Sequence, residues 1–173
     1  MKPTATVDAI VIGGGPAGLS GALLLGRCRR TVLVFDEGRP RNEKSPAVHA
    51  FLAHEGIAPA ELLRRGRQDL SRYPNVSFHR GKVVDACHES GTFRIRLEAG
   101  AEFRSRTLLI ATGMIDRLPP VADIVKFYGT TVHQCPYCDG WESTGRKIGV
   151  LGAGNAAAGL AVEMLLWSPH VSL

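Results

Sequence analysis

The segment "VDAIVIGGGPAGLSGALLLGRCRRTVLVFD", residues 7–36, decides the fold of this chain. It opens with a short apolar run at 7–12, continues into the glycine-rich "GGGPAG", and then into a helix-compatible stretch at 19–30. A β-branched run at 31–35 follows, of the kind that strands buried in a parallel sheet show. The segment therefore predicts a strand, a glycine turn, a helix and a second strand, which together form a βαβ unit.

The glycines of this unit match the dinucleotide-binding pattern Gly13-x-Gly15-x-x-Gly18. The first glycine of that pattern permits a tight turn, the second lets the backbone approach a pyrophosphate, and the third lets the helix pack against the strand. The N-terminus of the helix offers N–H groups and a positive dipole to phosphates. Asp36 closes the next strand, near the spacing expected of a carboxylate that holds ribose hydroxyls. A glycine turn that binds nothing is the alternative, and the flanking strand and helix disfavour it.

The region after Asp36 changes character twice. Residues 37–58 are rich in Pro, charge and His and are expected to form a loop, whereas residues 60–71 have a helical pattern. From residue 76 onwards apolar and polar residues alternate, with breaks at two X-Gly pairs, 90–91 and 99–100. We therefore expect an antiparallel hairpin or three-stranded meander that returns into a buried strand at 108–111.

A second strand–glycine turn–helix segment occupies residues 147–167 and carries the pattern Gly152-x-Gly154-x-x-Ala157. The pattern accepts alanine at its last position, because that position needs only a small packing residue. Residues 170–173 begin the following strand.

Two dinucleotide-binding patterns in one chain predict an α/β architecture. We expect a Rossmann-like domain over residues 1–116, made of the βαβ unit and the antiparallel meander. We expect the start of a second Rossmann-like domain over residues 117–173.

Residues 133–142 read "HQCPYCDGWE", in which Cys135 and Cys138 have the spacing of a redox dithiol. A thiolate is the working nucleophile of such a pair, and this spacing lets the two sulfurs join. A zinc site is one alternative: it would recruit His133 but needs a fourth ligand from elsewhere, and the chain has no second CxxC. A glutaredoxin-like site is another, but that fold needs most of its chain after the dithiol, and only a dinucleotide-type strand and helix follow here.

The other cysteines and histidines carry no partner pattern. Cys28 and Cys87 are most simply explained as small buried hydrophobes. Among the histidines, His49 stands out only for its place in the loop after Asp36.

Composition narrows the class of protein. The net charge is +5, but the basic residues are scattered and no recognition motif accompanies them, which favours a solvated surface over a nucleic-acid partner. Four cysteines with a single paired motif favour a reducing cytoplasm over secretion. The charge-free stretch 9–26 contains six glycines and Pro16, which fit a strand, turn and helix start better than a membrane span. We therefore expect a cytoplasmic protein without a membrane partner.

The "GGGPAG" pattern, "ATG" at 111–113, CxxC followed by Asp-Gly, and the second GxGxxA resemble, in this order, the low-molecular-weight thioredoxin reductase family. The resemblance implies an FAD site made of Gly13, Gly15, Pro16, Ala17, Gly18 and Asp36, with Ala111, Thr112 and Gly113 beside it. It implies an NAD(P)H site made of Gly152, Gly154, Asn155, Ala156 and Ala157. It also implies that Cys138 sits against the flavin, that Cys135 exchanges with the external partner, and that Asp139 is the acid/base residue.

Two departures from the family bear on the partner. The family's glycine-glutamine flavin loop is replaced by "RPRNEKSPAVHAFL", and "CPYC" followed by "DGWE" is closer to a branch of dithiol oxidases. The expected partner is therefore a thioredoxin-like protein or a small-molecule disulfide or dithiol, with oxygen as the acceptor in the oxidase alternative. A non-catalytic nucleotide- or zinc-binding protein is the alternative from another class.

The resemblance also implies a homodimer when the protein is full length. Because the family closes its flavin domain with a C-terminal segment, we expect these 173 residues to be a truncated product or fragment, with weak flavin retention and little activity of its own.

Overall fold

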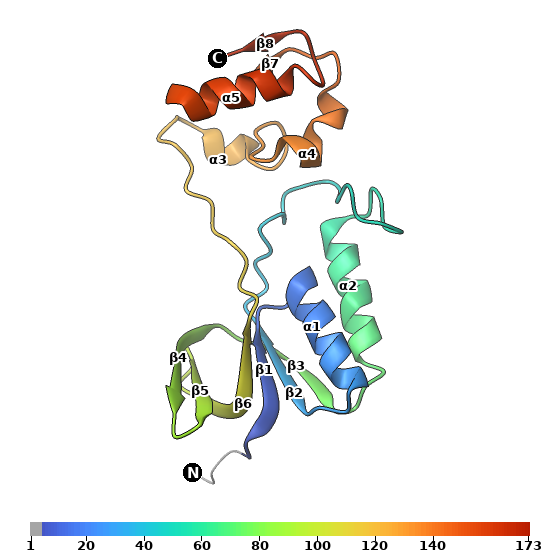
Figure 1. The fold of residues 1–173 in the computed structure, drawn as a ribbon, viewed down its shortest axis with the longest axis vertical. Coiled ribbons are helices and arrows are strands. Elements are labelled where there is room, and N and C mark those ends of the chain that lie inside the picture. Colours follow the sequence, from blue (N-terminus) through green and yellow to red (C-terminus); the bar gives the residue numbers. More distant parts are fainter. Residues whose placement is uncertain (1–4) are drawn as a thin grey trace. The chain divides into compact units, whose positions relative to one another are not determined.

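The computed structural model describes residues 5–173, which divide into two units (Figure 1). The units consist of the chain up to Glu43 with Pro59–Arg117, and of Lys44–Ala58 with Leu118–Leu173. The boundary drawn from the sequence after residue 116 differs from this division mainly in the segment 44–58, which packs with the second unit. That the first unit binds FAD and the second NAD(P)H stays a prediction.

The first unit is built on a six-stranded sheet in the order β3-β2-β1-β6-β5-β4. Its strands are β1 (Val7–Ile12), β2 (Val32–Asp36), β3 (Val76–Arg80), β4 (Val83–Glu89), β5 (Thr92–Leu97) and β6 (Glu102–Ile110). β1 pairs in parallel with β2 and β6, β2 pairs in parallel with β3, and β4, β5 and β6 form an antiparallel meander. The predicted α/β fold, with a βαβ unit and a meander, is confirmed.

Two helices pack on this sheet and lie side by side (Figure 1). They are α1 (Pro16–Arg27) and α2 (Pro59–Leu70). Side chains alternate across β1: Val11 belongs to a buried cluster with Leu19 of α1 and Leu63 of α2, whereas Ile10 belongs to a second cluster with Phe35. Full burial of each such side chain stabilises the fold by roughly 1.5–3 kcal/mol. Alternate residues of β1 therefore contribute to the cores on the two opposite faces of the sheet.

The pairing of β3 corrects one expectation. The alternating pattern from residue 76 was assigned to the antiparallel region, but β3 pairs in parallel with β2. The helix α2 supplies the crossover that a parallel connection requires. β3 ends where Gly81 N–H donates to the Asp36 carbonyl at 2.9 Å, and Phe78 packs against the helix-side cluster. The strand alternates because Val76 and Phe78 are partly buried against the helix-side cluster, whereas Ser77 and His79 are exposed.

The end of β6 corrects a second expectation. The strand predicted at 108–111 was expected to be buried, yet Leu109 is 38% and Ile110 68% exposed. β5 pairs with β6 only as far as Ser105, so within the described residues the last part of β6 has β1 as its sole strand neighbour.

The second unit ends in a strand, a turn, a helix and a strand, the same order as β1, α1 and β2 of the first unit. Its elements are α3 (Ile124–Phe127), α4 (Pro136–Asp139), the 3₁₀ turn η1 (Trp141–Ser143), β7 (Ile148–Gly149), α5 (Gly154–Met164) and β8 (Val171–Ser172). β7 and β8 pair in parallel, as the sequence predicted. Lys44 Nζ donates a hydrogen bond to the Val125 carbonyl at 3.0 Å, which ties the segment 44–58 to α3 of this unit.

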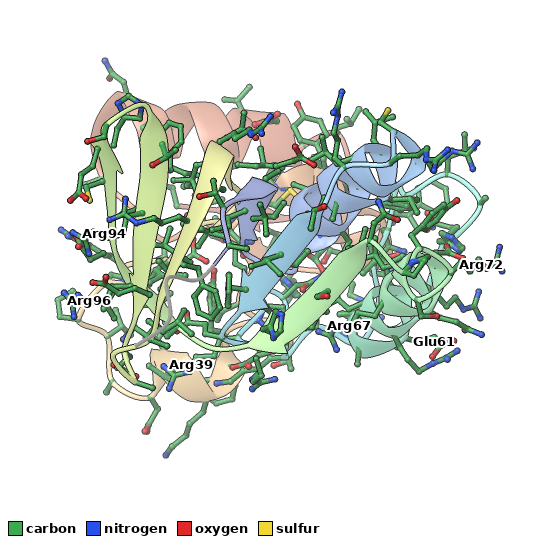
Figure 2. The ribbon with its side chains drawn as sticks, turned by 90° about the horizontal axis from the view of Figure 1, so that it is seen from below. Arg39, Glu61, Arg67, Arg72, Arg94 and Arg96 are labelled. Carbon is green, nitrogen blue, oxygen red and sulfur yellow. A yellow bond between two sulfur atoms is a disulfide. The ribbon has the colours of Figure 1, made fainter. Side chains whose placement is uncertain are left out.

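The basic side chains of the first unit are dispersed (Figure 2): Arg94 and Arg96 lie at the meander, and Arg72 lies beyond the end of α2. Arg94 pairs with Glu89 at 3.1 Å and with Glu102 at 2.8 Å. Some of the scattered basic residues are thus paired with acidic residues of the same unit.

The free cysteines are less buried than expected. Cys28, the C-cap residue of α1, is exposed, and Cys87 is half-buried on β4. Across residues 5–173, none of the helices has the length and apolar character needed to cross a membrane.

Candidate functional site

The first glycine pattern lies where β1 runs into α1. Gly13 has a φ of +107°, and a Cβ built there would lie 2.1 Å from the Ala111 carbonyl oxygen. A Cβ on Gly18 would lie 1.9 Å from the Gly13 carbonyl oxygen. Both glycines are thus required by close backbone packing. Gly15 caps α1 without a side-chain hydrogen bond, and a Cβ on it would meet no atom within 4 Å.

Asp36 lies beside this turn at the end of β2. Its Oδ1 accepts a hydrogen bond from Gly14 N–H at 3.1 Å, and its Oδ2 lies 3.7 Å from Arg67 Nη2. The structure therefore brings together Gly13, Gly18, Asp36 and Ala111. Pro16 and Ala17 form the first turn of α1, and Thr112 and Gly113 continue past β6, where Gly113 has a φ of +69°.

A polar cavity that no sequence pattern predicted begins next to Asp36. Its volume is about 300 Å³. It is lined by Glu37, Arg39, Arg80, Gly81, Lys82 and Glu98. Figure 2 shows Arg39 near this end of the sheet. The available signal was the charged residues directly after β2 and β3, because the carboxyl ends of parallel strands meet at one edge of a sheet.

The second glycine pattern lies between β7 and α5. A Cβ on Gly152 would lie 2.8 Å from the Ala157 Cβ, so these two small residues let the turn pack on the helix. Gly154 has a φ of +68° and begins α5. Asn155 and Ala156 are exposed in the first turn, and the N-cap Ala153 makes no side-chain hydrogen bond.

Cys135 and Cys138 are joined in a disulfide, with a Cα–Cα distance of 5.3 Å. Cys135 is the N-cap of α4 and Cys138 lies within that helix. The zinc alternative gains no support, because residues 5–173 contain no group of three or more His, Cys, Asp or Glu placed to hold a metal. His133 instead pairs with Asp139, its Nδ1 lying 3.2 Å from the Asp139 Oδ2.

A second histidine, His49 of the segment 44–58, contacts Glu142, which follows the disulfide segment. His49 Nδ1 lies 2.7 Å from Glu55 Oε1, and its Nε2 lies 3.6 Å from Glu142 Oε1. The hydrogen bond with Glu55 raises the pKa of His49 above 6.5, and the charges of Glu142 and Asp139 act in the same direction. None of these three contacts was predicted. His133–Asp139 and His49–Glu55 each join residues six positions apart that no motif links, and His49–Glu142 joins residues 93 positions apart.

We expect an NMR titration to place the pKa of His49 above that of an ordinary histidine. Because the folded-state pKa is raised, the pairing stabilises the fold fully below pH 6.5, and this contribution is lost as pH rises through the raised value. Glu55→Gln removes the first cause and should lower the pKa of His49. His54, whose ring packs on Phe51, is the control resonance. A His49 pKa that does not respond to Glu55→Gln would contradict this interpretation.

The helix α4 is anchored on the segment that follows α5. Tyr137, between the two cysteines, donates a hydrogen bond to Glu163, and its ring makes an edge contact with Trp167 at a centroid distance of 5.8 Å. The backbone of Gly140 lies directly against the same tryptophan ring. These contacts hold the disulfide segment in place within the second unit.

Gly140→Ala should therefore destabilise the second unit by about 1–3 kcal/mol, as overpacking does. Its Cβ would lie 2.4 Å from the Pro136 carbonyl oxygen and 2.8 Å from the Trp167 ring. Urea unfolding followed by circular dichroism measures the change. Gly149→Ala is the matched control, because a Cβ there meets no atom within 4 Å. Equal midpoints for the two variants would show that neither the Pro136 carbonyl nor the Trp167 ring constrains this site.

Comparisons with known proteins identify the family of this chain. The family model described as pyridine nucleotide-disulphide oxidoreductase matches residues 7–173. A probable thioredoxin reductase of Arthroderma benhamiae is 38% identical over 158 residues, which cover 88% of this chain and 39% of that protein.

Two solved structures are similar over nearly the whole chain. The crystal structure of HlmI has a TM-score of 0.93 and 37% identity, covering 97% of this chain and 54% of that one. A putative thioredoxin reductase, TrxB, from Bacillus anthracis has a TM-score of 0.91 and 31% identity, covering 95% of this chain and 56% of that one. The chain thus spans between 39% and 56% of the length of these three proteins.

Proposed function

The chain belongs to the pyridine nucleotide-disulphide oxidoreductase family, and on this premise we propose that the protein is a flavin-dependent thiol–disulfide oxidoreductase. The cofactors of that family are FAD and NAD(P)H. The observation that carries the proposal is the Cys135–Cys138 disulfide at the start of a helix, with Asp139 next to it.

The first unit offers groups that fit a dinucleotide. The first N–H groups of α1 have no side-chain cap, Gly15 leaves open space in front of them, and the Asp36 carboxylate stands beside the turn. We propose that FAD binds here, with Pro16, Ala17, Thr112 and Gly113 lining its site. When bound, FAD supplies two-electron redox chemistry.

The second glycine pattern offers a similar set of groups for NAD(P)H. α5 also begins without a side-chain cap, and Asn155 and Ala156 expose its first turn. Small residues at Gly152, Gly154 and Ala157 let a ligand approach the backbone there.

Reduction of the Cys135–Cys138 disulfide consumes two electrons and two protons and yields two thiols. We propose that Asp139 gives a proton to the thiolate that leaves, and that His133, 3.2 Å from the Asp139 carboxylate, holds it in place. Cys138 would exchange electrons with the flavin, and Cys135 would meet the external disulfide.

The partner is a finer proposal. Two of the similar proteins are named as thioredoxin reductases, one of them as probable and the other as putative, which supports a thioredoxin-like protein. The second candidate is oxidation of a small-molecule dithiol: Tyr137 and Trp141, 69% and 79% exposed, give the disulfide segment an aromatic surface on which a small apolar dithiol could stack. The homodimer implied by the resemblance stays a prediction.

Anaerobic spectroscopy of the flavin-loaded protein separates the two candidates. A reductase loses its flavin colour when NADH or NADPH is added. An oxidase loses it when a dithiol is added and forms hydrogen peroxide in air. A protein bleached by neither donor would contradict the proposed function.

A further inference from the structure

Arg67 extends from α2 to the end of β2, where Asp36 stands beside the first glycine turn (Figure 2). Its Nη2 lies 3.7 Å from Asp36 Oδ2, and its guanidinium carbon lies 5.0 Å from the centre of the Phe78 ring. The preceding residue, Gly66, lets α2 pack closely on α1, because a Cβ there would lie 2.9 Å from Leu19 Cδ1. The crossover helix therefore brings a cation to the carboxylate of the predicted ribose site.

The groups around Arg67 are packed against the backbone of the glycine turn. A Cβ on Gly14 would lie 2.8 Å from Phe78 Cε2 and 2.9 Å from Asp36 Cβ, so the turn leaves no space for a side chain between them. Gly14 N–H donates a hydrogen bond to Asp36 Oδ1 at 3.1 Å. One carboxylate oxygen of Asp36 thus faces the turn, and the other faces Arg67.

The Asp36 side chain is largely shielded from water, with 14% of it exposed. A carboxylate in such a place is destabilised unless a cation or hydrogen-bond donors compensate for the lost water. Gly14 N–H supplies a donor and Arg67 supplies the cation. The Phe78 ring in turn limits the orientations of the guanidinium, because a cation over an aromatic face is attracted to it.

We propose that Arg67 is a positioning residue of the FAD site: resting on Phe78, it holds the Asp36 carboxylate in the orientation that receives the adenosine ribose. The proposal rests on the proposed function, in which FAD binds at this turn. Without Arg67, Oδ2 loses its charged partner and the carboxylate is free to turn away from Gly14. Ribose hydroxyls would then meet a carboxylate spread over several orientations, and ordering it would weaken binding.

The test begins with a double-mutant cycle on FAD affinity, measured by fluorescence quenching. The cycle compares wild type, Asp36→Asn, Arg67→Met and the double variant. Methionine keeps an unbranched apolar side chain over Phe78 and removes the charge. Arg65→Met is the matched control, because Arg65 lies on the same helix and pairs with Glu61 at 2.8 Å.

We expect Asp36→Asn to weaken FAD binding by roughly 10- to 100-fold, as loss of a charged hydrogen-bond acceptor does. Arg67→Met should weaken it by roughly 3- to 30-fold, within the range of couplings between contacting residues. In the Asp36→Asn background the same change should alter affinity by less than about twofold, because the carboxylate that Arg67 positions is gone. Arg67→Lys should recover part of the loss, and Arg65→Met should equal wild type.

Hydrogen exchange of the Gly14 amide reports the position of Asp36 in the flavin-free chain, because this N–H donates to Asp36 Oδ1. Measured by NMR, its exchange should be roughly 3- to 10-fold faster in Arg67→Met, as local opening produces, and unchanged in Arg65→Met. The Gly13 amide is the internal reference, since it donates to the Phe35 carbonyl at 2.8 Å and does not depend on a side chain.

Three results would overturn the role of Arg67 and leave the proposed function standing. The first is wild-type FAD affinity in Arg67→Met while Asp36→Asn binds weakly. The second is an equal loss in both backgrounds, which would indicate direct contact with the cofactor through Arg67 Nε, a buried donor that has no partner within residues 5–173. The third is Gly14 exchange that is unchanged, or accelerated equally with Gly13, which would indicate at most a general effect on stability.

A different result overturns the cofactor site itself. Wild-type FAD affinity in Asp36→Asn would remove Asp36 from the proposed site, and the role of Arg67 with it. Melting temperatures of the flavin-free proteins show whether each variant is folded. If Arg67→Met does not fold, Arg67→Lys carries the same cycle, with a smaller expected loss that should also vanish in the Asp36→Asn background.

Discussion

Replacing Cys138 with serine is expected to lower disulfide turnover by about a thousandfold or more. A serine hydroxyl is not ionised near neutral pH and cannot form the disulfide with Cys135, so the two-electron exchange has no protein carrier. Stability should change little, because α4 is held by Tyr137 and Gly140 against Trp167 rather than by the sulfur alone. The measurement is disulfide-dependent oxidation of NAD(P)H by the flavin-loaded protein.

Cys28→Ser is the matched control, since Cys28 is a free, exposed cysteine in the first unit. Its turnover should equal that of wild type. Cys135→Ser should behave like Cys138→Ser. Undiminished turnover in both of these variants would favour the alternative of a nucleotide-binding protein that does not use its cysteines.

Gly15→Ala is expected to weaken flavin binding by roughly 10- to 100-fold, equivalent to about 1.4 kcal/mol for each tenfold step. The residue has a φ of −75° and a ψ of −179°, an extended backbone that alanine adopts without strain. The new Cβ meets no protein atom within 4 Å. It would instead occupy the space through which a pyrophosphate approaches the first turn of α1.

Gly18→Ala is the informative contrast, because its Cβ would lie 1.9 Å from the Gly13 carbonyl oxygen. That variant should lose fold stability as well as flavin. Flavin affinity from fluorescence quenching and melting temperature from circular dichroism separate the two effects. A Gly15→Ala protein with wild-type flavin affinity would remove this turn from the proposed cofactor site.

Local patterns were sufficient for the elements whose partners lie close in sequence. The apolar runs and glycines of β1, α1 and β2 predicted that unit, and β7, α5 and β8 followed from the same pattern. The pairing of β3 was missed because alternation reports one buried face and does not identify the neighbouring strand. That neighbour is set by the crossover through α2.

In the candidate site too, the residues that belong to one local sequence pattern were predicted and the long-range contacts were not. Gly13, Gly18 and Asp36 were predicted because their roles follow from spacing along one βαβ unit, and the structure brings them together. The contact of His49 with Glu142 was not predictable from the sequence. The segment 44–58 has no regular alternation of apolar and polar residues, and the two residues are more than ninety positions apart.

The most direct measurement of the proposed function is an anaerobic reductive titration of the flavin-loaded protein. If flavin and the Cys135–Cys138 disulfide exchange electrons, wild type should take up two electrons per flavin more than Cys138→Ser before full reduction, because a disulfide is a two-electron couple. Alkylation at the end point should label both cysteines in wild type. Equal electron uptake by the two proteins, with the wild-type disulfide still intact beside reduced flavin, would contradict the assignment.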